Sequence, residues 1–101
     1  MSNVNNKKSI NKDHADVTVE ALEAAIWEYR TGRGETFAIE AKLQAQKDAA
    51  HGAGFAREAI VMGHALSCIQ YTAMAIEDGD IEYDSAERRF EKMISKIERI
   101  K

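Results

Sequence analysis

The sequence contains no proline, a single cysteine and a single tryptophan among its 101 residues. Without proline, no residue interior to the chain lacks a backbone donor, which favours uninterrupted helices. Cys68 has no partner for an internal disulfide, which fits a reducing compartment. With 14 basic and 17 acidic residues, the formal net charge is -3. That balance is typical neither of a strongly basic nucleic-acid binder nor of an acidic DNA mimic.

Long apolar runs are also missing. The N-terminus has no stretch of signal-peptide length, and no segment approaches the roughly 20 apolar residues of a membrane span. We therefore expect a cytoplasmic protein. The chain is 45% hydrophobic and 31% charged, which is typical of a globular domain. Its length fits one domain.

The polar start of the chain predicts a flexible tail over residues 1–16 and a helical domain over residues 17–101. We expect the first helix to begin at Thr18, with Val17 and Leu22 spaced as a hydrophobic staple. Glycines at positions 32 and 34 should end this helix. Its predicted buried face recurs every three or four residues: Val19, Leu22, Ile26 and Tyr29.

A second helix is predicted from about Thr36, with a buried stripe of mostly small residues that would allow close approach of a neighbour: Phe37, Ala41, Ala45 and Ala49. Gly52 and Gly54 predict a break or kink, with one bent helix over residues 36–77 as the alternative. The third segment has the strongest signal, because apolar residues alternate spacings of four and three without a miss: Phe55, Ala59, Met62, Leu66, Ile69, Ala73 and Ile76.

A turn is predicted over residues 78–80, followed by a fourth helix. Asp84 and Glu87 have the spacing of a capping box, so we expect Asp84 to cap this helix. Its predicted buried face consists of Ala86, Phe90, Met93, Ile97 and Ile100. The sequence thus predicts an all-α fold, a small bundle of three to four helices with the third helix central.

Candidate chemistry is sparse. His64 and Cys68 are four residues apart, so both side chains could reach one metal ion, with Asp48 and His51 completing a tetrahedral set. The chain has no Cys-x-x-Cys or His-Glu-x-x-His motif, and no residue is placed to orient His64 as a base for Cys68. We expect no catalytic site, no cofactor and no metal. An enzyme or metal protein centred on His51, His64 and Cys68 is the lesser alternative.

Two features indicate protein binding. Trp27 lies about a third of a turn away from the predicted buried face of the first helix. It either packs at the edge of the bundle or serves as an exposed anchor, a role in which tryptophan is enriched. Opposite the seam of the third helix runs a second line, typical of an interface core: Arg57, Ile60, His64, Ser67, Tyr71 and Met74. The alternative is that helices of the same chain cover this line.

Acidic residues gather after the third helix at Asp78, Asp80 and Glu82. They lack the glycine and glutamate positions of an EF-hand calcium loop. They are interpreted as a solvated turn or as an acidic patch offered to a basic partner.

We expect a non-enzymatic helical regulator or inhibitor that binds a protein partner, with a homodimer possible. In size, lack of proline, mild acidity and lack of catalytic motifs, the chain resembles accessory proteins of phages and mobile elements. This resemblance implies an inhibitor of a host defence system. The alternative is a nucleic-acid-associated regulator with a basic patch that includes Arg30 and Arg33. Additional cations for that patch are Arg88, Arg89 and the lysines at positions 7, 8 and 12.

Overall fold

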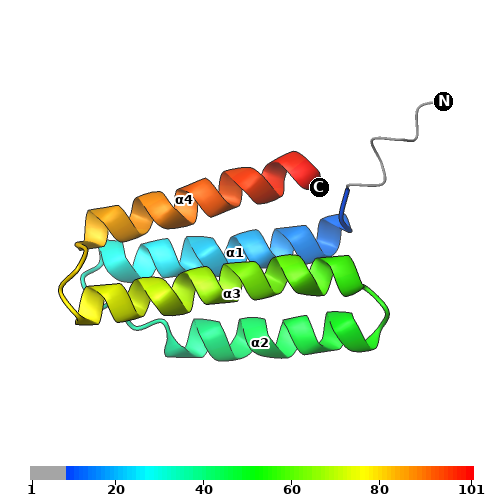
Figure 1. Ribbon diagram of the computed structural model, residues 1–101, viewed down its shortest axis with the longest axis horizontal. Coiled ribbons are helices and arrows are strands. Elements are labelled where there is room, and N and C mark those ends of the chain that lie inside the picture. Colours follow the sequence, from blue (N-terminus) through cyan, green and yellow to red (C-terminus); the bar gives the residue numbers. More distant parts are fainter. Residues whose placement is uncertain (1–8) are drawn as a thin grey trace.

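The computed structural model describes residues 9–101 and shows four antiparallel helices (Figure 1). They are α1 (Lys12–Arg30), α2 (Phe37–Gly52), α3 (Ala56–Glu77) and α4 (Tyr83–Ile100). The described residues form no strand. The predicted all-α bundle is therefore confirmed, and the predicted break separates α2 from α3. Gly54 adopts a φ of +91° in this connection, a conformation that residues with a Cβ rarely adopt.

The helices pair most closely as α1 with α4 and α2 with α3, while α1 and α3 also contact each other. In Figure 1, α1 and α3 lie in the middle, with α2 and α4 outermost. The prediction of a central third helix is confirmed, although α1 shares that place. The core consists mainly of the seams expected for α1, α3 and α4. Its fully buried large residues include Leu22, Met62, Ile69, Phe90 and Ile97.

The start of α1 differs from the prediction. This helix begins at Lys12, six residues before the expected Thr18. Asn11 caps it, because its side-chain oxygen accepts from the His14 backbone N–H at 3.1 Å. The Thr18 hydroxyl is buried inside the helix and donates to the His14 carbonyl at 2.7 Å. The predicted tail over residues 1–16 is therefore wrong for residues 12–16, and its first eight residues lie outside those described.

Two long-range backbone contacts hold this early start in place. The Ile10 N–H donates to the Ile100 carbonyl at 2.8 Å, and the Ile10 side chain is buried. The Asn11 N–H donates to a Glu58 carboxylate oxygen at 2.7 Å, which holds the pKa of Glu58 below its ordinary value. The residues that precede α1 are thus hydrogen-bonded to both α4 and α3. The start of α1 lies beside the end of α4 (Figure 1).

The buried face of α2 also differs from the prediction. The expected stripe of Phe37, Ala41, Ala45 and Ala49 is exposed along its whole length, and Phe37 is 83% exposed. The helix instead packs through Leu43 and Ala50, supported by the half-buried Ile39. Three alanines gain little from burial, whereas the fully buried Leu43 gains about 1.5–3 kcal/mol and the half-buried Ile39 gains part of that, so these two side chains set the orientation.

The cap of α4 lies two residues before the predicted one. Glu82 occupies the cap position without a side-chain hydrogen bond, and the helix begins at Tyr83. Asp84, predicted to be the cap, lies inside the first turn, where its Oδ1 accepts from the Ser85 N–H at 2.9 Å. Its carboxylate still stabilises the helix through the positive end of the helix dipole. The predicted turn at residues 78–80 is present, with a φ of +79° at Gly79.

Gly34 closes the end of the bundle where Tyr29 meets Tyr83. The two rings lie 5.0 Å apart, edge to face. Gly34 has a φ of +63°, and a Cβ there would lie 3.1 Å from both Tyr29 Cε1 and the Tyr83 hydroxyl. A side chain would therefore meet both backbone strain and crowding.

We expect Gly34→Ala to lower the free energy of unfolding by about 2 kcal/mol or more, because the left-handed conformation alone costs roughly 1–2 kcal/mol. Gly79→Ala is the matched control, since Gly79 also has positive φ but open space around its Cβ position. Urea denaturation followed by circular dichroism measures both changes. Equal losses in the two variants would show that the tyrosine contact is looser than described.

Candidate functional site: the outer face of the third helix

The outer face of α3 is open to solvent. Ile60, Tyr71 and Met74 are 58%, 65% and 57% exposed. They belong to the predicted second line, which we call the α3 line: Arg57, Ile60, His64, Ser67, Tyr71 and Met74. Only Ser67 is partly buried. The alternative in which the chain's own helices cover this line is therefore wrong.

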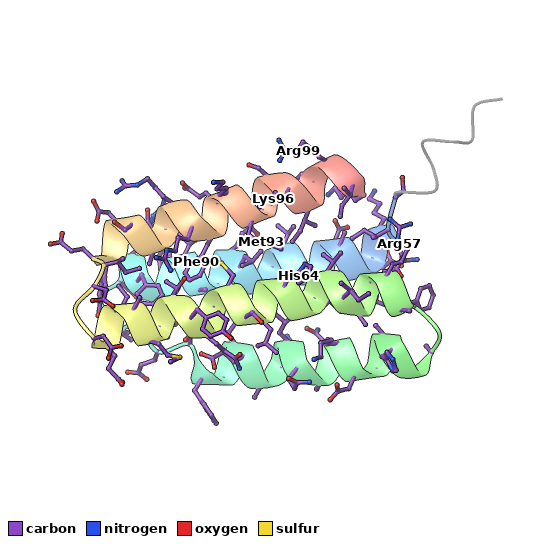
Figure 2. All side chains as sticks on the ribbon, viewed as in Figure 1. Arg57, His64, Phe90, Met93, Lys96 and Arg99 are labelled. Carbon is purple, nitrogen blue, oxygen red and sulfur yellow. The ribbon has the colours of Figure 1, made fainter. Side chains whose placement is uncertain are left out.

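The α3 line lies between two grooves. Helix α3 contacts both α2 and α4, and Figure 2 shows His64 on α3 and Lys96 on α4. Ile60, His64 and Ser67 line the groove toward α2, which holds about 630 Å³. Tyr71 lines the groove toward α4, which holds about 350 Å³. The line is thus a ridge with a hollow on each side.

Three cations of α4 flank the ridge. Arg89, Lys92 and Lys96 line the α3/α4 groove, and we call them the α4 cations. Their spacing of three and four places them on one face of the helix, which Arg99 continues. None of the three forms an ion pair within residues 9–101. Sequence reasoning missed this set, although a helical wheel of residues 85–99 separates these cations from the acidic residues of α4.

The floor of the α3/α4 groove is formed by Cys68, Thr72 and Met93. Burial raises the pKa of the Cys68 thiol above its ordinary value, and the nearby positive charges of Arg89 and Lys96 offset part of the rise. The Thr72 hydroxyl is also buried and has no hydrogen-bond partner among residues 9–101. A raised pKa keeps the thiol protonated and poorly nucleophilic at neutral pH.

We expect iodoacetamide to alkylate Cys68 more slowly in the folded protein than in the urea-unfolded protein at neutral pH, because the folded state disfavours the thiolate. The rate should rise with pH, and its midpoint should lie above that of the unfolded chain. Mass spectrometry of the alkylated protein over a pH series measures both curves. Coincident curves would contradict the burial of this thiol.

The other predicted site residues do not join the α3 line. Trp27 is 59% exposed and lines a separate groove between α1 and α4, together with Glu23 and Glu91. The acidic residues Asp78, Asp80 and Glu82 are exposed at the turn between α3 and α4. Arg57 belongs to the line, and its guanidinium donates to the Ser9 carbonyl at 3.1 Å.

The predicted basic patch at Arg30 and Arg33 is occupied by carboxylates. Arg30 pairs with Glu87 at 2.7 Å, and Arg33 pairs with Glu28 at 3.1 Å. The second pair lowers the pKa of Glu28 through the Arg33 hydrogen bond. Both arginines therefore serve contacts within the bundle. Arg89, named for the same patch, lies instead with Lys92 and Lys96 in the α3/α4 groove.

His51, His64 and Asp48 line the α2/α3 groove, whereas Cys68 lines the groove on the other side of α3. Among residues 9–101, no group of three or more His, Cys, Asp and Glu residues is placed to hold a metal ion.

Helix α3 is the most apolar of the four described helices. By length and composition it could cross a membrane, with a mean hydropathy of 1.4 over 18 residues. The expectation that no segment approaches the apolar length of a membrane span is therefore wrong for α3. The core helix of a bundle has the same composition, and α3 packs against all three other helices. Only 33% of that window is buried. Part of its apolar surface, at Ile60, Tyr71 and Met74, lies exposed on the α3 line.

No family model, curated protein sequence or solved structure matches the chain.

Proposed function

We propose that the chain is a non-enzymatic binding module that docks a protein partner on the α3 line. The observation that carries the proposal is the exposure of three large apolar side chains, Ile60, Tyr71 and Met74, along one helix edge. Isolated exposed apolar residues are common, but a row of them beside an arginine and a histidine has the composition of an interface core. A regulator or inhibitor acts through such docking.

The charge around the α3 line favours a different protein, and disfavours a second copy of this chain, as the partner that binds there. Two copies joined face to face by a twofold axis would bring both sets of α4 cations to one interface. Like charges facing each other cost binding free energy and slow association. If the chain forms a homodimer, we expect the two copies to meet through a different surface. Size-exclusion chromatography with light scattering measures whether the chain is a monomer or a dimer. A dimer that Tyr71→Ala dissociates would overturn the choice of a different protein.

The proposal is tested by affinity capture with three baits. The wild type and Phe37→Ala, which alters an exposed side chain on α2, should retain the same protein from a bacterial lysate. Tyr71→Ala should lose it, because tyrosines at interface centres often contribute 2 kcal/mol or more. Circular dichroism must show equal folding of all three. Identical captured sets from all three baits would contradict the proposal.

A further inference from the structure

The chemistry of the α3/α4 groove indicates what kind of partner it receives. Its rim carries the three α4 cations and Tyr71, and its floor carries Cys68 and Met93. Within residues 9–101, no aspartate or glutamate lines this groove. Cations around an apolar floor complement a segment that carries carboxylates beside an apolar side chain.

The two grooves beside α1 have mixed charge. One contains Glu20 and Lys42, and the other contains Glu23, Glu91 and Arg30, with the exposed Trp27. Among the described residues, the charged residues that line the α3/α4 groove are all cations, although the net charge of the chain is -3. This local positive charge attracts an acidic partner toward the α3/α4 groove.

We infer that the α3/α4 groove binds an acidic segment of the partner protein, with its carboxylates on Arg89, Lys92 and Lys96 and an apolar side chain on Met93. The inference rests on the proposed docking function and names the chemistry of the partner. The ridge from Ile60 to Met74 rises about 21 Å along α3, the length of about four helical turns. An amphipathic helix with one acidic edge matches this length and pattern.

A nucleic-acid strand is the competing polyanion, and the apolar side chains disfavour it. Ile60 and Met74 are aliphatic, whereas strand-binding surfaces present stacked aromatic rings along the cationic track. This face carries one exposed aromatic in its middle, Tyr71, with Phe55 at the far end of the helix. The overall negative charge also repels a densely charged strand.

The test selects peptides from a random 16-residue display library on three immobilised proteins: the wild type, Lys92→Glu/Lys96→Glu, and Lys12→Glu/Lys42→Glu. Both double variants shift the formal net charge by four units, from -3 to -7, so they differ only in where the charge changes. Lys92→Gln/Lys96→Gln repeats the test without new negative charge. All proteins are first checked for equal thermal unfolding.

Peptides selected on the wild type and on Lys12→Glu/Lys42→Glu should be enriched in Asp and Glu at helical spacing and should bind Tyr71→Ala weakly. On Lys92→Glu/Lys96→Glu this enrichment should vanish, and a wild-type peptide should bind about tenfold more weakly or worse. Raising the salt concentration should weaken wild-type binding.

Peptides that require Tyr71 but lack acidic enrichment would overturn the inference and leave the docking function in place. No peptide that requires Tyr71 would overturn both. Retention of a 20-nucleotide single strand by the wild type, lost in Lys92→Glu/Lys96→Glu, would overturn the inference in favour of a nucleic acid.

Discussion

Replacing Phe90 with alanine is expected to lower the free energy of unfolding by about 3–5 kcal/mol. Phe90 is fully buried on α4, and its ring stacks on Tyr29 of α1 at 5.8 Å between centroids. Removing it leaves a cavity between α1 and α4, one of the two closely packed helix pairs, and takes away the ring contact. A domain of this size has about 5–15 kcal/mol of stability in all, so the variant should be close to unfolded.

Urea denaturation of the purified variant measures this loss. Arg99→Ala is the matched control on the same helix, because Arg99 is exposed and forms no ion pair within the described part of the chain. It should change the free energy of unfolding by less than about 0.5 kcal/mol. A loss below about 1 kcal/mol for Phe90→Ala would mean that α4 does not pack on α1 as described.

The second large effect is on binding. The combined variant Ile60→Ser/Tyr71→Ala/Met74→Ser should bind the captured partner at least about 100-fold more weakly, a loss of about 2.7 kcal/mol. All three side chains are more than half exposed, so the fold should lose little stability. Calorimetric titration measures the affinity, and urea denaturation measures the stability of the same preparations.

Phe37→Ser is the control for that variant, because it removes a still more exposed apolar residue from α2. It should leave both the affinity and the stability nearly unchanged. If the triple variant unfolds, the α3 line belongs to the core of the free protein. If it folds and binds normally, the partner uses another surface.

The sequence predicted α3 well because its seam is long and built of large side chains. Leu66 and Ile69 gain so much from burial that the orientation of the helix follows from their spacing. The exposed line opposite the seam then follows from helix geometry alone. Sequence pattern could not show whether another helix covers that line, because this depends on how α2 and α4 pack.

The orientation of α2 was predicted wrongly for a physical reason. Alanine is compatible with both a close helix contact and a solvent-exposed helix surface, so the stripe through Ala41 and Ala45 carried little directional information. The larger Leu43 decided the outcome. The start of α1 was missed because Ile10, isolated in a polar stretch, finds its partner at Ile100 across the whole chain, a contact that no local pattern predicts.

The α4 cations can be seen in the sequence, but the pattern of α4 alone does not show that they line a groove with α3. Within α4 alone, Lys96 and Arg99 lie near the negative end of the helix dipole, where cations are favoured, so their presence needs no partner to explain it. Their significance arises from the neighbouring α3, whose exposed Tyr71 lies on the same groove as Lys92. Such a site is formed between helices, so the charge pattern of either helix alone does not reveal it.

The central claim is that α3 buries one edge in the bundle and leaves the opposite edge free for a partner. Oxidation by hydrogen peroxide tests it directly, because Met62 on the first edge is 1% exposed and Met74 on the second is 57% exposed. Peptide mass spectrometry should show rapid sulfoxide formation at Met74, slow formation at Met62, and protection of Met74 when the partner is bound. Equal slow oxidation of both methionines in the free protein, or no protection of Met74 in the complex, would contradict the account.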